Sequence, residues 1–208
     1  MGLAADERRL LSTLLDEVGP DAPTLCEGWR TRDLAAHLVV REHRLDAAPG
    51  IAVPALAGYT QRVQDGYAAQ PWPELVEQVR RGPAWYWPAA IGPLAELTNA
   101  AEFLVHHEDV RRAQPGWHPR RLDPARADRV WQLARQAAKL NLRKTPVGVV
   151  LRTPDGRSAA VASGSPVVTV TGEPVDLLLF VFGRDAVKLG YEGDESAVAQ
   201  LISAKRGV

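Results

Sequence analysis

A segment expected to form a helix, residues 93–113, carries a glutamate and a histidine one helical turn apart. Glu102 and His106 are four residues apart, and side chains at positions i and i+4 lie on one face of an α-helix. A carboxylate and an imidazole in this arrangement can grip a metal ion from two points. One further histidine would complete the two-histidine, one-carboxylate set of a catalytic zinc site.

His37 is the best candidate for the third ligand. On its own expected helix it lies within about 60° of an apolar stripe formed by Leu34, Leu38 and Leu45, so it should face the interior of a bundle. The spacing leaves two other interpretations open. A polar seam on a helix is usually its solvent-facing side, and a histidine beside an apolar stripe is usually a hydrogen-bonded core residue.

Several neighbouring side chains could support such a site. Asp109 shares the polar seam of Glu102 and His106, whereas His107 points about 100° away; we assign both to the surroundings of the metal, with an interface or solvent position as the alternative for His107. Cys26, the only cysteine, could be a nucleophile beside a helix N-terminus. We expect it instead to pack next to Trp29.

Three residues are candidates for substrate binding. Arg41, one turn after His37, and Arg184, at the end of an apolar segment, could each hold a carboxylate by a bidentate contact, although a surface ion pair is the commoner role of an arginine. Trp85 lies in an aromatic run between prolines. It could wall a substrate pocket, or it could fill a gap between packed elements.

The elements that must position these residues fall into two groups. The first is a helical bundle over residues 1–145, in which Thr31 is the expected N-cap of the helix that carries His37. The second is a small α/β domain over residues 146–208. Its expected strands cover 147–152, 158–162, 167–171 and 187–189, with a hairpin turn at 153–156 and helices at 173–182 and 194–204. The fold class is therefore α+β.

The overall composition narrows the function. The 208 residues include 25 basic and 25 acidic ones, so the charge balance favours neither nucleic acid nor a membrane surface as a partner. No apolar run reaches the length of a membrane span and the N-terminus lacks a signal sequence, so we expect a cytoplasmic protein. Motifs for ATP, dinucleotide and acyl chemistry are absent.

Two stretches carry a family resemblance. Residues 25–38 (LCEGWRTRDLAAHL), followed far downstream by Glu102 and His106, resemble the DinB-like metal-binding bundles of actinobacteria. Residues 168–184 (VTVTGEPVDLLLFVFGR) are similar to the C-terminal domain of the mycothiol-dependent maleylpyruvate isomerase family. The resemblance covers nearly the whole chain. It implies a DinB-like four-helix bundle that holds a divalent metal, most often zinc, through His37, Glu102 and His106.

The resemblance further implies that the metal helps a low-molecular-weight thiol attack a small electrophile. Our first hypothesis is thus a zinc-dependent thiol transferase or isomerase with mycothiol as the expected cosubstrate. A non-catalytic module with a structural metal, closed by a fourth ligand such as His107 or Asp109, is the alternative. A hydrolase that uses metal-bound water is a further one, with Asp109 as its general base. The sequence determines neither the substrate nor the oligomeric state.

Overall fold

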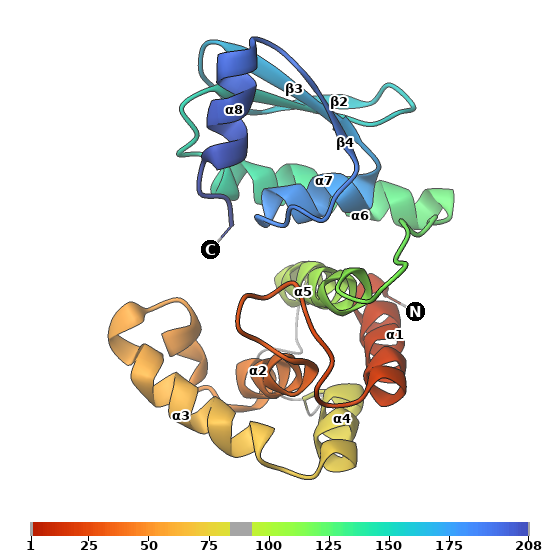
Figure 1. Ribbon diagram of the computed structural model, residues 1–208, viewed down its shortest axis with the longest axis vertical. Helices are drawn as coiled ribbons and strands as arrows, with labels where there is room; N and C mark the ends of the chain where they lie inside the picture. Colours follow the sequence, from red (N-terminus) through yellow and green to blue (C-terminus); the bar gives the residue numbers. More distant parts are fainter. Residues whose placement is uncertain (1, 84–92, 208) are drawn as a thin grey trace. The chain divides into compact units, whose positions relative to one another are not determined.

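The computed structural model describes residues 2–83 and 93–207, and the chain divides into two compact units, Met1–His118 and Pro119–Val208. The first unit is helical and the second combines helices with a sheet (Figure 1). The predicted α+β class is confirmed. The first unit contains α1 (Leu3–Val18), α2 (Thr31–His43), α3 (Ala57–Ala68), α4 (Trp72–Arg81) and α5 (Pro93–Arg112), with two short 3-10 turns at Ala48–Ile51 and Pro54–Leu56.

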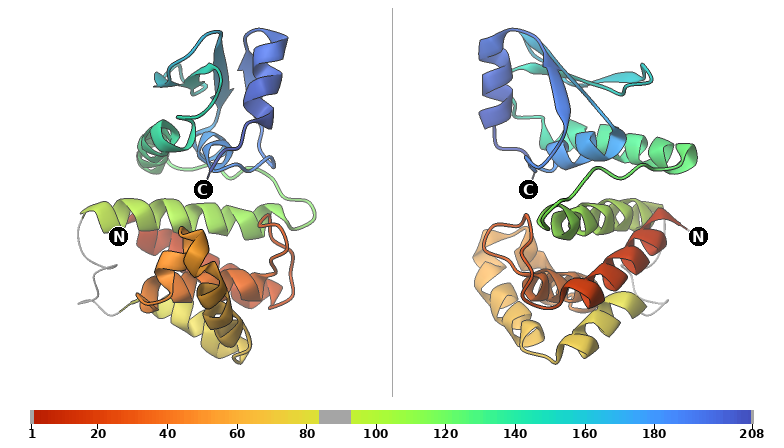
Figure 2. Two further views of the ribbon diagram at one scale, coloured as in Figure 1. Left: turned by 90° about the vertical axis from the view of Figure 1, so that its left-hand side faces the viewer. Right: turned by 45° about the vertical axis from the view of Figure 1, so that its right-hand side comes forward.

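The core of the first unit draws on four helices that are distant in sequence. Leu11 of α1, Leu38 of α2, Leu75 of α4 and Phe103 of α5 are all completely buried in one apolar cluster. The views of Figure 2 agree that α1 and α2 lie on the same side of α5. Because α2 and α5 are both fastened to this cluster, the polar side chains that they carry toward each other are held in place.

The guanidinium of Arg8 also links these helices inside the first unit. The Arg8 guanidinium of α1 forms an ion pair with Glu42 of α2, whose side chain is 1% exposed. One of its nitrogens is 2.6 Å from a Glu42 oxygen and another contact, of 2.8 Å, reaches the Val79 carbonyl near the end of α4. The same guanidinium lies 4.0 Å from the centre of the Phe103 ring. One arginine thus connects α1, α2, α4 and α5.

The start of α2 differs in detail from its prediction. The N-cap residue is Arg30, not Thr31, and the Asp33 carboxylate accepts a hydrogen bond of 2.8 Å from the Arg30 backbone N–H. The Thr31 hydroxyl instead donates to the Gly19 carbonyl at 2.6 Å, which ties the helix to the end of α1. Leu45 lies beyond the end of α2 and is 50% exposed, so it is not part of the apolar stripe.

The second unit contains α6 (Pro124–Asn141), β1 (Gly148–Arg152), β2 (Ser158–Ala162), β3 (Val167–Gly172), α7 (Pro174–Val181), β4 (Leu189–Glu192) and α8 (Glu195–Ser203). The strand order is β2-β1-β3-β4. The predicted hairpin is confirmed, because β1 pairs with β2 in antiparallel fashion. β1 and β3 are parallel, and β3 and β4 are antiparallel. β4 begins at Leu189, where the predicted strand at 187–189 ends.

The boundary between the units lies earlier than the predicted position near residue 145. α6 was expected to belong to the helical bundle, but it groups with the sheet-containing unit. The reason is α7: all eight of its residues, from Pro174 to Val181, are buried, and α6 packs along it. A helix that is buried on every side must be covered by other elements on every side. Within the part of the chain described, no helix is both long and apolar enough to cross a membrane.

Candidate metal centre

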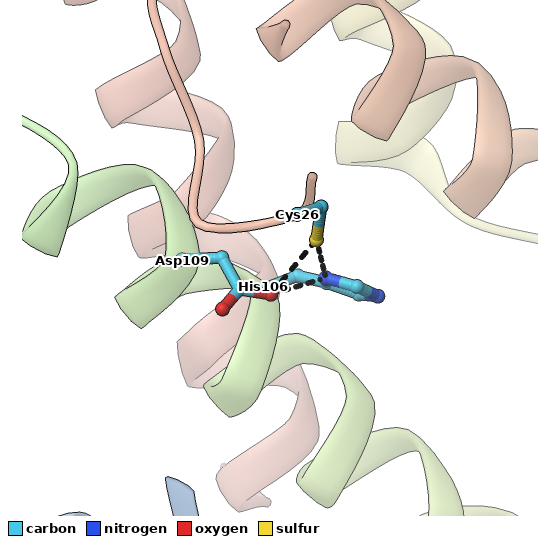
Figure 3. Close-up of side chains that lie close together, drawn as sticks. All are labelled: Cys26, His106 and Asp109. Carbon is cyan, nitrogen blue, oxygen red and sulfur yellow. Dashed lines mark hydrogen bonds and ion pairs between the residues drawn. The ribbon is translucent and has the colours of Figure 1, made fainter. Parts of the chain in front are cut away.

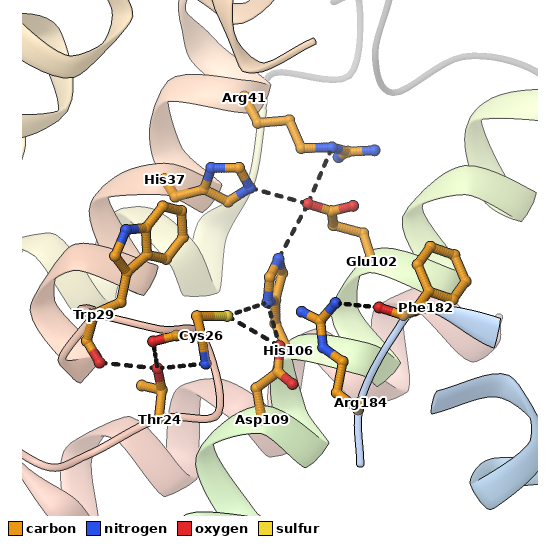
Figure 4. Close-up of polar contacts among 10 residues, drawn as sticks. All are labelled: Thr24, Cys26, Trp29, His37, Arg41, Glu102, His106, Asp109, Phe182 and Arg184. Atoms are coloured by element: carbon orange, nitrogen blue, oxygen red, sulfur yellow. Dashed lines mark hydrogen bonds and ion pairs between the residues drawn. The ribbon is translucent and has the colours of Figure 1, made fainter. Parts of the chain in front are cut away.

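His37, Glu102 and His106 lie together inside the first unit (Figure 4). His37 extends from α2, and the other two extend from successive turns of α5. Nε2 of His37 is 3.1 Å from Oε1 of Glu102, and Nε2 of His106 is 3.3 Å from the same oxygen. Each imidazole therefore directs its Nε2 at the same oxygen of Glu102, and these three potential ligand atoms converge on one point.

The chemistry and spacing of these donors fit a metal ion. Imidazole nitrogen and carboxylate oxygen bind zinc at about 2.0–2.2 Å, which places neighbouring ligand atoms of a tetrahedral site roughly 3.4 Å apart. The separations of 3.1 and 3.3 Å are close to this value. The side chains of His37 and His106 are 8% and 10% exposed, and that of Glu102 is 23% exposed. The site is sheltered but reachable on the carboxylate side.

Arg41 and Asn99 surround the carboxylate of Glu102. Nε of Arg41 lies 3.5 Å from Oε1 of Glu102, and another guanidinium nitrogen donates to Oδ1 of Asn99 at 2.8 Å. Arg41 is on α2, one turn after His37, while Asn99 precedes Glu102 on α5. The arginine therefore lies at the predicted site, where it orients the carboxylate across the helix pair.

The opposite edge of His106 faces a second set of groups (Figure 3). Nδ1 of His106 is 2.9 Å from Oδ2 of Asp109 and 3.9 Å from Sγ of Cys26. The thiol of Cys26 also donates to Oδ2 of Asp109 at 3.2 Å. Cys26, His106 and Asp109 form the second group of the described residues whose ligand atoms converge closely enough for a metal ion.

The two groups share His106, and the chemistry of imidazole makes them alternatives. A neutral imidazole donates a hydrogen from one nitrogen and offers a lone pair at the other. With a cation at Nε2, the Nδ1–H can donate to Asp109, the arrangement in which metal-binding histidines are usually held by an outer carboxylate. With a cation at Nδ1, Glu102 would take the outer role. Asp109 thus lies beside the predicted trio and not within it.

The titration of these groups reflects their surroundings. Burial would lower the pKa of His106, but its hydrogen bonds to Asp109, Cys26 and Glu102 outweigh burial and hold that pKa well above its usual value. Burial would raise the pKa of Glu102, but hydrogen bonds from His106 and His37 keep it well below its usual value. The pKa of His37 is lowered, chiefly because burial disfavours the charged form. Without a metal ion, these surroundings favour the charged form of His106 and the neutral form of His37.

The loop between α1 and α2 places Cys26 and Trp29. The Leu25 backbone N–H donates to the Asp109 carbonyl at 3.0 Å, which fastens the loop to α5. The Thr24 hydroxyl accepts from the Cys26 N–H at 3.1 Å and lies 2.9 Å from the Trp29 carbonyl. The Trp29 ring then packs on His37, with centroids 5.0 Å apart. Cys26 and Trp29 are both partly buried against the core, and the contacts of Cys26 with His106 and Asp109 were not anticipated.

The remaining predicted residues lie elsewhere. Nδ1 of His107 is 2.8 Å from Oε2 of Glu7 on α1, so its contact fastens α1 to α5 and does not involve the trio. Arg184 belongs to the second unit, where its guanidinium donates to the Phe182 carbonyl at 2.7 Å. Trp85 lies outside the described residues.

Comparison with known proteins finds a structural likeness but no sequence match. A crystal structure of a mutant of the mycothiol-dependent maleylpyruvate isomerase matches with a TM-score of 0.57 and 15% sequence identity, and the match covers 91% of this chain and 90% of the other. No family model matches the chain, and no curated protein matches its sequence. At this identity the likeness shows a shared fold.

Proposed function

We propose that this protein binds a divalent metal, most consistently zinc, through His37, Glu102 and His106, and that it acts on a small electrophile with a low-molecular-weight thiol as cosubstrate. The observation that carries the proposal is the convergence of two imidazole nitrogens and one carboxylate oxygen on a single point. In this proposal the first unit is a DinB-like four-helix bundle. The choice of thiol chemistry, and of mycothiol as the thiol, is supported by the function of the structural neighbour.

In this proposal, residues around the metal ligands orient those ligands and bind the substrate. A bound divalent cation lowers the pKa of a coordinated thiol, so that the thiol is held as the nucleophilic thiolate. Asp109 orients His106 through Nδ1, and Arg41 orients Glu102. Arg41 is also the residue of the first unit that is best placed to attract a substrate carboxylate. Arg184 remains a predicted substrate-binding residue.

The first test is metal content. We expect the purified protein to contain about one equivalent of metal, and we expect His37→Ala and Glu102→Gln to lose it because each removes one of three ligands. His118→Ala, on the segment that ends the first unit, is the matched histidine control and should keep the metal. Elemental analysis of the folded variants is the measurement. Full metal content in both ligand variants would contradict the proposed ligand set.

The second test is the reaction. The metallated protein is mixed with mycothiol and a panel of small electrophiles, and the products are followed by mass spectrometry. We expect adduct formation or isomerisation that depends on both the metal and the thiol. A fully metallated protein that accelerates neither would overturn the thiol chemistry and would favour a non-catalytic metal-binding module.

The group of Cys26, His106 and Asp109 supports a second candidate, a thiophilic metal bound on the other edge of His106. The two sites differ in whether sulfur is a ligand. Cobalt(II) substituted into the protein in the absence of added thiol gives a strong near-ultraviolet charge-transfer band only if Cys26 coordinates it. We expect no such band, and we expect Cys26→Ser to leave the cobalt spectrum unchanged. A band that disappears in Cys26→Ser would assign the metal to the second group.

Hydrolysis by metal-bound water gains less support. The predicted general base, Asp109, is occupied by His106 and by the thiol of Cys26. Its carboxylate lies on the Nδ1 side of His106, away from the point at which Glu102 and the two Nε2 atoms converge.

A further inference from the structure

The first unit contains a second polar site that the proposed metal chemistry does not use. A cavity of about 310 Å³ opens between the turn that precedes α2, the first turns of α2, and α3. Gly28, with a φ of 76°, allows the tight turn that brings Trp29 to its wall. The cavity is lined by Glu27, Gly28, Trp29, Asp33, Ala36, Gln61, Gln64, Asp65 and Ala68. Its volume is at the lower end of small-molecule sites.

All the charged residues that line this cavity are acidic. Glu27, Asp33 and Asp65 contribute three carboxylates, whereas no lysine, arginine or histidine is among the lining residues. A concave site with charges of one sign concentrates ions of the opposite sign. The occupant should therefore be a cation.

The spacing of the carboxylates argues against a bare metal ion. Among the described residues, the groups whose ligand atoms converge within 4.8 Å are the two around His106, and neither contains Glu27, Asp33 or Asp65. A metal ion needs oxygens that meet at bonding distance. Carboxylates that line a wider cavity fit an organic cation, which several of them can contact at once.

Gln64 independently points to a ligand. It lies on α3, is 8% exposed and lines the cavity. Its neighbour Gln61 donates to Asp65 at 2.8 Å, but the side-chain amide of Gln64 has no hydrogen-bond partner among the described residues. The Gln64 amide is not among the fully enclosed groups that lack a partner, so its polar atoms can reach a group placed in the cavity. The Gln64 amide can accept a hydrogen bond from an N–H group placed in the cavity.

Trp29 connects this cavity to the metal centre. Trp29 lines the cavity, and its indole ring packs on His37, with ring centroids 5.0 Å apart. The face of a tryptophan ring attracts ammonium groups. A molecule whose cationic end occupies the cavity would thus be held beside the metal ligands.

We propose that this cavity, formed by Glu27, Asp33, Gln64, Asp65 and Trp29, binds the protonated amine of a small organic molecule. The inference goes beyond the proposed function, since it depends neither on the metal nor on thiol chemistry. It adds a recognition site for a positively charged group next to the centre.

The test uses the full-length protein after treatment with a chelator, so that an amine cannot bind through the metal. The probes are 1,4-diaminobutane and n-butylamine, with 1,4-butanediol and succinate as neutral and anionic controls, titrated by calorimetry at neutral pH. We expect both amines to bind and both controls to fail. In a protein labelled with ¹⁵N, the indole signal of Trp29, assigned with Trp29→Phe, should shift during the amine titration.

Variants of the lining decide where the amine binds. Glu27→Gln combined with Asp65→Asn alters two exposed carboxylates and should weaken binding at least ten-fold; Gln64→Leu should weaken it to a similar extent. Asp33 is left intact because it also caps α2. Glu17→Gln, an exposed carboxylate of α1 outside the cavity, is the control and should have no effect. Equal binding of the diol, or amine affinity unchanged in the lining variants, would overturn the proposal.

Discussion

His106 has a carboxylate on each edge of its imidazole ring, and this position determines what the residue can do. Oε1 of Glu102 lies 3.3 Å from Nε2, and Oδ2 of Asp109 lies 2.9 Å from Nδ1. Two carboxylates favour the charged form of the ring, whereas a metal ion requires the neutral form with a free lone pair. Proton and metal therefore compete for Nε2 of His106.

Asp109→Asn tests the outer carboxylate. If the metal is bound at Nε2, the loss of the Asp109 charge should weaken metal affinity roughly 10–100-fold, because outer carboxylates orient and strengthen histidine ligands. Competition with a chromophoric chelator measures the effect. Cys26→Ser is the matched variant on the same edge of the His106 ring. If the metal is bound at Nε2, this variant should change metal affinity by less than about three-fold. An unchanged affinity in Asp109→Asn would show that Asp109 does not support the ligand.

The pH at which the fold is most stable should rise when metal is added. The raised pKa of His106 stabilises the metal-free fold below the usual histidine pKa of about 6.5, and this contribution is lost as pH rises through the folded pKa. The lowered pKa of Glu102 stabilises the fold above the usual glutamate pKa of about 4.5, and this contribution is lost as pH falls through the folded pKa. Both contributions are present between these values.

With chelator, we therefore expect the contribution of these two groups to stability to be largest at mildly acidic pH. With saturating zinc the optimum should move to higher pH, because metal binding displaces the proton from His106. Thermal melts across this range, with and without metal, measure the difference. Parallel pH profiles in the two conditions would contradict proton–metal competition at His106.

At the scale of the elements, α5 contacts the core, α1 and the loop before α2. Its Phe103 lies in the core, its His107 contacts Glu7 of α1, and its Asp109 carbonyl holds the loop before α2. Its polar side meets α2 at Asn99 and Glu102, and it meets the loop before α2 at Asp109. The same helix thus supplies both structural contacts and candidate ligands on different faces.

Arg8→Ala should destabilise the first unit by about 3–5 kcal/mol, because it leaves the carboxylate of Glu42 buried without its partner. Arg9→Ala, at the next position of α1, alters an exposed residue and should change stability by less than about 0.5 kcal/mol. Urea unfolding followed by circular dichroism compares the two. Similar values for both variants would show that the connection through Arg8 is not important for stability.

At the scale of the whole chain, α6 is important because it belongs to the sheet-containing unit and covers α7. Val130, Trp131 and Ala134 of α6 are buried, and the helix packs along the fully buried α7. Removal of α6 would expose apolar residues of α7, including Leu177 and Phe180, to water. The sheet-containing unit should therefore need α6 in order to fold.

Two fragments test this division. A fragment of residues 119–208 should give a cooperative thermal transition and a dispersed NMR spectrum, since it retains α6. A fragment of residues 146–208 lacks α6 and should be unfolded or aggregated, because it exposes one side of an apolar helix. Equal folding of the two fragments would place the boundary near residue 145 after all.

Local features of the chain could be predicted from the sequence because they depend on neighbours a few residues apart. The pairing of Glu102 with His106 follows from one helical turn, and α8 (Glu195–Ser203) lies where a helix was predicted at 194–204. The hairpin of β1 and β2 follows from alternating residues around a turn. Even so, the start of α2 and the position of β4 each differed by one or more residues.

Only the tertiary structure could decide the relationships between distant residues. His37 meets Glu102 across 65 positions, Cys26 meets His106 across 80, and His107 meets Glu7 across 100. Helical periodicity says which face of a helix is apolar, but it does not say which helix covers that face. For the same reason, the sequence analysis assigned α6 to the helical bundle, whereas it belongs to the sheet-containing unit. The sequence thus determined which groups could bind a metal, and the packing of α2, α5 and the loop between α1 and α2 determined which of them meet.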